Sequence, residues 1–215
     1  MVNLFDWHHT RDPDTGHITL ASPCQSLRVD FDPTDTQGVW WRVIHHEPYW
    51  QARFSWQTPI EAIAAVTQSL PRILGDRRHA DRISLTATGR PQTADFSGWT
   101  RTRGERSTTY TSADGHCSLT DQPDDQLRWQ IRSSLFDGFD TQWTAAFTRA
   151  VPSRLVVQFF AHLVADTPVE RTYGDLPHLV QRSTNVVITP IRRAAINPHV
   201  HHALTRLADH QRHRR

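Results

Sequence analysis

The stretch WQARF at residues 50–54 returns as WTAAF at residues 143–147, and this recurrence organises the rest of the chain. In both stretches the large apolar side chains occupy alternate positions, which is the period of a β-strand with one buried face. A proline follows each stretch at the same distance, at Pro59 and Pro152, and opens a helical pattern. We therefore expect two diverged copies of one unit, each ending in a strand and a helix.

Further matches lie upstream in the same order, since residues 41–43 resemble residues 129–131 and residues 22–33 align with residues 112–123. Alternating apolar positions between short polar turns predict antiparallel strands with one face exposed to water. The predicted strands are residues 15–21, 27–31, 39–43 and 50–54 in copy one, and residues 99–103, 108–112, 116–120, 127–132 and 142–148 in copy two.

The helix of each copy has its own signals. Thr58, Pro59 and Glu61 form a capping box in copy one. Pro71 disfavours helical geometry at the residue before it, so we expect this helix to reach Leu70. The side chains expected to face the core are Ile60, Ile63, Ala64, Thr67 and Leu70 in copy one, and Leu155, Val156, Phe159, Phe160 and Leu163 in copy two.

The predicted fold is α+β: two tandem ββββα-type repeats, with antiparallel sheets each followed by a helix, plus a C-terminal helix. That last helix is expected at residues 198–210, after a short strand at residues 186–189. The expected domains are a first repeat at residues 1–75, a basic join at 76–93, a second repeat at 94–190, and a C-terminal helix with a basic tail at 191–215.

The composition is that of an ordinary globular protein, with 37% hydrophobic and 21% charged residues in 215. The first residues lack the apolar core of a signal peptide, and the chain has no apolar run of about 18 residues, so we expect a cytoplasmic protein without a membrane partner. Cys24 and Cys117 are then expected to be reduced residues of the core.

All 24 basic residues are arginine, and the formal net charge is +2. GC-rich codon usage explains this preference, and arginine also suits phosphate binding and base stacking; the two explanations are compatible. Because the chain is nearly neutral, a nucleic-acid-binding surface would have to be a local patch.

A known family shares this pattern of a serine–proline turn, a tryptophan strand, a W-x-A-x-F strand and a threonine–proline helix. The pattern stands here as Ser22-Pro23, Trp41, residues 50–54 and Thr58-Pro59. The chain thus resembles the DUF317 or SPDY family of actinobacteria, common in streptomycetes and on their plasmids, in which two copies per chain are usual. Copy two departs from the pattern at Ala113 and Val151. The resemblance implies an actinobacterial or mobile-element origin and brings no established chemistry.

A looser, architectural resemblance links two tandem ββββα units to the whirly and PC4-like single-stranded DNA-binding proteins. Catalysis is poorly supported, because the chain has no glycine-rich phosphate loop, no G-x-S-x-G and no H-E-x-x-H motif. His199 and His202 could share a helix face, but two ligands do not complete a zinc site. We therefore expect neither an enzyme, nor a cofactor, nor a metal.

The eight tryptophans divide by strand parity. Trp41, Trp50, Trp129 and Trp143 occupy matched apolar positions and are expected in the core, although a duplicated stacking platform would look the same. Trp40, Trp56 and Trp99 lie beside arginines, as single-strand binding by stacking requires; packing under the helices or in a dimer interface is the alternative. The candidate nucleic-acid-binding residues are Trp40, Arg42, Arg53, Trp56, Trp99, Arg101, Arg103, Arg128 and Arg132.

The sequence therefore favours a nucleic-acid-binding protein in plasmid or chromosome maintenance, with single-stranded or distorted DNA as the expected partner. The alternative is a protein-interaction or homo-oligomerisation module, because interfaces between proteins also favour tryptophan and arginine.

Overall fold

The structure, a computed structural model, describes residues 5–74, 96, 98–135, 141–165, 168–176, 181–182 and 186–191. The chain forms two compact units, residues 1–170 and residues 171–215, so both repeats belong to one unit. The predicted join at residues 76–93 and the predicted helix at residues 198–210 lie outside the described residues. Residues 186–189 are described and form no strand, so that part of the prediction is wrong.

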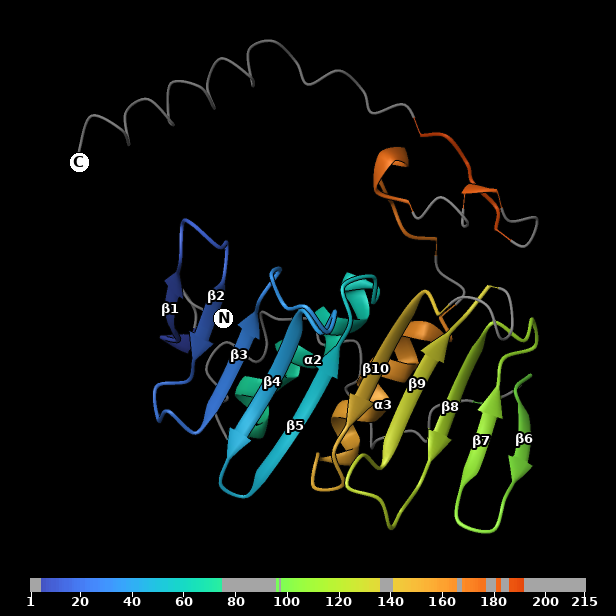
Figure 1. Ribbon diagram of the computed structural model, residues 1–215, viewed down its shortest axis with the longest axis horizontal. Helices are drawn as coiled ribbons and strands as arrows, with labels where there is room; N and C mark the ends of the chain where they lie inside the picture. The colour runs from blue at the N-terminus through green and yellow to red at the C-terminus, as the bar shows by residue number, and fades with distance from the viewer. Residues whose placement is uncertain are drawn as a thin grey trace. The chain divides into compact units, whose positions relative to one another are not determined.

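Within the described residues, each repeat has five strands and one helix (Figure 1). In copy one these are β1 His8–Arg11, β2 Ile18–Ala21, β3 Leu27–Phe31, β4 Trp41–His46, β5 Tyr49–Phe54 and α2 Ile60–Ile73. In copy two these are β6 Thr100–Arg103, β7 Thr108–Thr111, β8 Cys117–Asp121, β9 Trp129–Ser133, β10 Trp143–Phe147 and α3 Ser153–Leu163. The second unit contains a short 3₁₀ helix, η1 Tyr173–Asp175.

The strands form one continuous antiparallel sheet in the order β1-β2-β3-β4-β5-β10-β9-β8-β7-β6. The expectation of two separate sheets is therefore wrong, because β5 pairs with β10 and joins the repeats. The expectation of four strands per repeat is also wrong for copy one, where β1 is an additional edge strand. All four residues of β1 are exposed and polar, so the strand shows no apolar alternation.

Reciprocal hydrogen bonds mark a local two-fold axis between β5 and β10. The N–H of Thr148 donates to the carbonyl of Gln51 at 2.9 Å, and the N–H of Ser55 donates to the carbonyl of Thr144 at 2.9 Å. The N–H of Gln51 donates to the Thr148 hydroxyl at 2.8 Å, and the N–H of Thr144 donates to the Ser55 hydroxyl at 2.8 Å. Ser55 and Thr148 are thus equivalent residues of the two repeats, as are Gln51 and Thr144.

Both helices pack on the same face of the sheet and contact each other, and Figure 1 shows them behind the strands. Phe54 and Phe147 are fully buried beneath them, with ring centroids 5.6 Å apart, and each packs on Phe159 of α3. The predicted equivalence of Trp50 with Trp143 and of Phe54 with Phe147 is confirmed by their positions in β5 and β10. Trp50 is buried as expected, whereas Trp143 is half-buried at the edge of the core.

The predicted capping box does not form. The Thr58 hydroxyl makes no cap hydrogen bond and instead donates to the carbonyl of Thr144 in the other repeat, at 3.1 Å. Ile60 is 48% exposed at the first helical position rather than buried, while Ile63 and Leu70 face the core as predicted. The helix also continues through Pro71 to Ile73, because a proline this close to the end removes little of the hydrogen bonding. The inward residues of α3 are as predicted.

Candidate nucleic-acid interface

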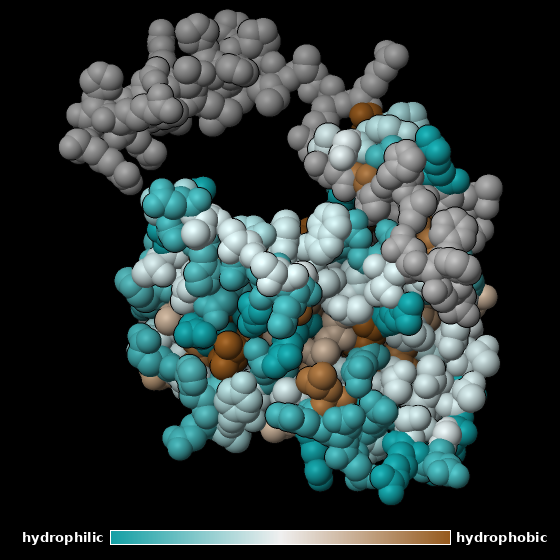
Figure 2. All heavy atoms as spheres, in the orientation of Figure 1, coloured by the Kyte–Doolittle hydropathy of each residue, from teal (hydrophilic) through white to brown (hydrophobic). Residues whose placement is uncertain are grey.

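The face of the sheet opposite the helices, called the open face below, is lined by the alternate residues of each strand. One row of this face crosses all ten strands by direct pairing. This central row consists of Thr10, Thr19, Asp30, Arg42, Arg53, Ala146, Gln130, Thr120, Thr109 and Thr102. Figure 2 shows the open face as mostly hydrophilic, with apolar side chains in small separate spots.

The charges of the open face belong mainly to copy one. Asp30, which is 6% exposed, pairs with Arg28 at 2.8 Å and accepts a hydrogen bond from the Thr19 hydroxyl at 2.9 Å. Arg42 pairs with Asp35 of the β3–β4 loop, and this hydrogen bond is the main cause that lowers the pKa of Asp35. These two arginines are therefore already neutralised by acids of the protein.

Two arginines near the local two-fold axis are not neutralised in this way. Arg53 is exposed and donates to the side-chain carbonyl of Gln51 at 3.0 and 2.8 Å, which leaves its charge uncompensated. Arg132 is exposed on β9 and makes no ion pair with a described residue. The neighbouring strand β10 has only Thr144 and Ala146 on this face, so nothing bulky separates the two cations.

The same face of copy two carries hydroxyl groups. Three outer strands each place two of them at alternate positions on the face that holds Arg132; those of β6 are exposed and those of β7 and β8 are half-buried. These residues, called the hydroxyl half below, are Thr100, Thr102, Thr109, Thr111, Ser118 and Thr120. The sequence analysis missed them, although the repeated pattern of a hydroxyl residue at alternate positions, 100/102, 109/111 and 118/120, is visible in the sequence.

The nine predicted site residues do not form one surface. Arg42, Arg53 and Arg132 lie on the open face. Arg101 and Arg103 lie on the helix side of β6, where Arg101 is opposite Tyr110, with its Cζ atom 5.8 Å from that ring. The predicted combination of Arg42 with Arg101 and Arg103 is therefore not assembled, because the sheet separates them.

Trp99 packs into the core rather than into an exposed platform. Its ring lies 5.6 Å from Phe160 of α3 and 5.9 Å from Phe96. Register explains this position: β1 and β6 are equivalent edge strands, so Trp7, which is 3% exposed, is the counterpart of Trp99 in copy one. By the same rule that assigned the other matched tryptophans to the core, Trp99 belongs there too.

Trp40 and Trp56 lie together at one end of the sheet. Their ring centroids are 5.8 Å apart, Trp40 also contacts Phe31, and Trp56 is 55% exposed. Equivalent loop hydrogen bonds show that Arg128 and Arg149 of copy two occupy the matching positions. Arg128 is already engaged, since it pairs with Asp121 at 2.9 Å and lies 4.3 Å above the ring of Trp129.

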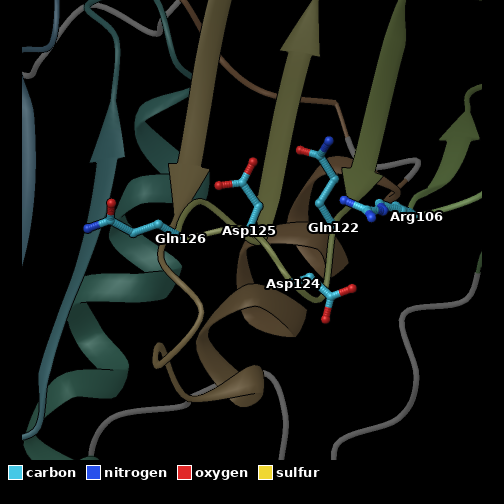
Figure 3. A pocket seen from close by; sticks show the side chains of 5 residues that line it. All are labelled: Arg106, Gln122, Asp124, Asp125 and Gln126. Carbon is cyan, nitrogen blue, oxygen red and sulfur yellow. The ribbon is translucent and has the colours of Figure 1, made fainter.

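A hollow of about 330 Å³ lies beside the β8–β9 loop. Its lining residues are Arg106, Gln122, Asp124, Asp125 and Gln126. Figure 3 shows that their polar groups point in different directions rather than toward a common centre. This hollow therefore lacks the convergent polar groups of a small-molecule site.

The fold and the open face together define a class: an α+β protein with two repeats fused into one sheet, with helices on one face and, in the described part of residues 1–170, a polar face without a covering helix on the other. The chain belongs to the SPDY family, described as a domain of unknown function (DUF317), whose sequence model matches residues 21–72 and 111–169. Each matched region begins at the last strand residue before the Ser22 or Ser112 turn and extends through the helix, so the structural repeat is longer than the family match by two strands.

No curated protein and no solved structure matches the chain. Among the residues that the structure describes, no helix has the length and apolar character needed to cross a membrane.

Proposed function

We propose that this protein binds nucleic acid on the open face of the sheet. One observation carries the proposal: Arg53 and Arg132 share this face with no described carboxylate to neutralise them, whereas Arg28 and Arg42 are paired with Asp30 and Asp35. The face is thus locally positive in a chain whose formal net charge is only +2.

Phosphate binding is what such a surface does best. Guanidinium groups bind phosphate oxygens in pairs of hydrogen bonds, and hydroxyl and amide side chains add further contacts to phosphate and sugar. These contacts carry no sequence information, so the proposed binding tolerates any sequence. It requires no cofactor and no catalytic residue, and a role in plasmid or chromosome maintenance would use it as a packaging or protecting activity.

Salt dependence tests the proposal. In a fluorescence-anisotropy titration with labelled oligonucleotides, affinity should fall as salt rises, because each neutralised phosphate releases counterions. Arg53→Ala and Arg132→Ala should each weaken binding and make the log–log slope shallower by about 0.7 to 0.9. Arg103→Ala is the matched control, since Arg103 is exposed on the other face of the sheet.

Absence of binding to any DNA or RNA oligonucleotide at low salt would end the proposal. An equal loss of binding in Arg103→Ala would show that the nucleic acid contacts the helix side of the sheet rather than the open face.

A protein-interaction module is the second candidate, favoured by the pair of Trp40 and Trp56 at one end of the sheet, whose ring centroids are 5.8 Å apart. Trp56 is 55% exposed, and large exposed apolar side chains mark interaction sites. In this case Trp56→Ala should lower the mass measured by light scattering, while oligonucleotide titrations stay flat. Unchanged mass with intact oligonucleotide binding would exclude this second candidate.

A further inference from the structure

We propose that the ligand of the open face is a nucleic-acid duplex lying along the central row, across the strands, and that the two repeats contact it by different chemistry. This inference rests on the proposed function and adds the form of the ligand and its direction on the protein. It follows from the aromatic content of the face, from its dimensions, and from the differences between equivalent residues.

The open face has almost nothing on which single-stranded bases could stack. Among the described strand residues of this face, Tyr49 is the one phenylalanine, tyrosine or tryptophan, and it begins β5 at the end of the sheet. Two histidines, His8 and His46, complete the aromatic rings of these strands on this face. Trp99 is used in the core, and the pair of half-buried Trp40 and exposed Trp56 lies at the end of the sheet. Single-strand binding relies on successive aromatic platforms, whereas backbone contacts to a duplex rely on arginine, threonine, serine and glutamine side chains, which this face supplies.

The dimensions of the face also suit a duplex. Ten strands spaced by about 4.8 Å make the central row about 43 Å long, and strands of about five residues make the face about 17 Å across. At 3.4 Å per base pair, the row matches about 12 base pairs.

Equivalent positions show that the two halves of the open face have diverged in chemistry. Where copy one has Arg28, Arg42 and Arg53, copy two has Ser118, Gln130 and Ala146, and Arg132 of copy two replaces Ile44. A pseudo-symmetric sheet thus carries an asymmetric surface. The duplex meets the two uncompensated guanidinium groups, Arg53 and Arg132, near the middle of the sheet, and the outer strands of copy two add the neutral hydroxyl half.

These two kinds of contact differ in a measurable way. A guanidinium that neutralises a phosphate releases ions, so its loss changes both affinity and salt dependence. A hydroxyl that donates to a phosphate or sugar oxygen releases no ion, so its loss changes affinity alone. Each hydrogen bond of this kind is worth a factor of about 2 to 12 in affinity.

The test compares DNA duplexes shorter and longer than about 12 base pairs, the same duplexes in RNA, and the labelled single strands, using the full-length protein at several salt concentrations. We expect tighter binding to at least one duplex than to either single strand. Affinity should rise with duplex length up to about 12 base pairs and then level off. Which of the two duplexes binds more tightly identifies the natural form of the ligand.

Two sets of variants test the division between the halves. Arg53→Ala should weaken duplex binding and make the log–log slope shallower by about 0.9. The double variant Thr102→Val and Thr111→Val should weaken binding about 4-fold or more and leave the slope unchanged. Valine keeps the shape and the strand preference of threonine, so these variants should fold. Thr108→Val is the matched control, because Thr108 lies on the helix side of β7.

The outcomes separate the inference from the function on which it rests. No binding to any oligonucleotide overturns both. Tighter binding to single strands than to duplexes overturns the inference and leaves nucleic-acid binding in place. Equal effects of Thr108→Val and the double variant would show that the hydroxyl half does not face the ligand.

Discussion

The two cysteines are in opposite chemical surroundings. Cys24 is exposed in the turn between β2 and β3, so the prediction that it lies in the core is wrong. The hydroxyls of Ser22 and Ser26 lie 3.4 and 3.0 Å from its Sγ atom. These hydrogen bonds, that of Ser22 first, lower the pKa of the Cys24 thiol to about 7. Burial, together with the charge of Asp114, raises the pKa of Cys117 to about 12. The thiolate is the reactive form of cysteine, so these two residues should react at very different rates.

We predict that a thiol reagent modifies Cys24 alone in the folded protein. A lowered pKa means that the thiolate persists to lower pH, so the rate should reach half its plateau near pH 7 rather than near pH 9. Cys117 should react only after unfolding. Mass spectrometry after pulses of iodoacetamide between pH 5 and 9 measures both rates. Ser26→Ala removes one stabilising hydroxyl and should shift the Cys24 profile to higher pH; an unshifted profile would contradict the role given to that hydrogen bond.

The faces of the sheet on which most of the tryptophans lie could be predicted from the sequence. Parity assigned Trp41, Trp50, Trp129 and Trp143 to the apolar face, and the register confirms this side for all four. Trp99 is predicted to be exposed because Arg101 and Arg103 follow it, and this prediction is wrong. Its counterpart Trp7 could have been found in the sequence, since residues 7–11 and 99–103 share the tryptophan, the threonine and the last arginine at the same spacing; the registers of β1 and β6 confirm the equivalence.

At the level of elements, the sequence predicted the strands and their antiparallel order within each repeat, but not the pairing of β5 with β10 that joins the repeats. Every predicted strand of residues 15–54 and 99–148 overlaps a strand of the structure. Alternation reports which face of a strand is buried and says nothing of which strand lies beside it. The pairing of β5 with β10 joins residues about ninety positions apart in the sequence. A hydrogen bond from the Thr58 hydroxyl to the other repeat supports this pairing, although in the sequence Thr58 has the position of a helix cap.

The pairing of β5 with β10 predicts different stability losses for substitutions at the equivalent positions Thr148 and Ser55. Thr148→Val removes the acceptor of the Gln51 N–H, a buried hydrogen bond, and should cost about 1–3 kcal/mol in the free energy of unfolding. Ser55→Ala removes the equivalent acceptor of the Thr144 N–H, which is exposed to water. Water can replace this lost partner, so the second substitution should cost less. Urea titrations of both variants give the comparison; equal costs would contradict the difference in burial.

For the whole molecule, the continuous sheet makes each repeat part of the core of the other. Phe54 of copy one packs on Phe147 and Phe159 of copy two, and the two helices contact each other above the same strands. Separating the repeats would expose these rings and leave β5 and β10 without their partners. The family match treats the repeats as two regions, whereas the structure places them in one compact unit.

We therefore predict that a substitution in one repeat destabilises both repeats equally. Phe147 is fully buried, and Phe147→Ala should cost about 3–5 kcal/mol, a large part of the roughly 5–15 kcal/mol that stabilises a typical domain. Because Phe54 loses its ring contact and β5 depends on β10, the amides of β3 and β4 in copy one should lose protection with those of β8 and β9. Hydrogen exchange followed by mass spectrometry measures both sets in one experiment. Ile60→Ala, at an exposed position of α2, is the control and should change neither set. If Phe147→Ala speeds exchange in β8 and β9 while β3 and β4 keep their protection, the repeats are independent folding units that share a sheet edge.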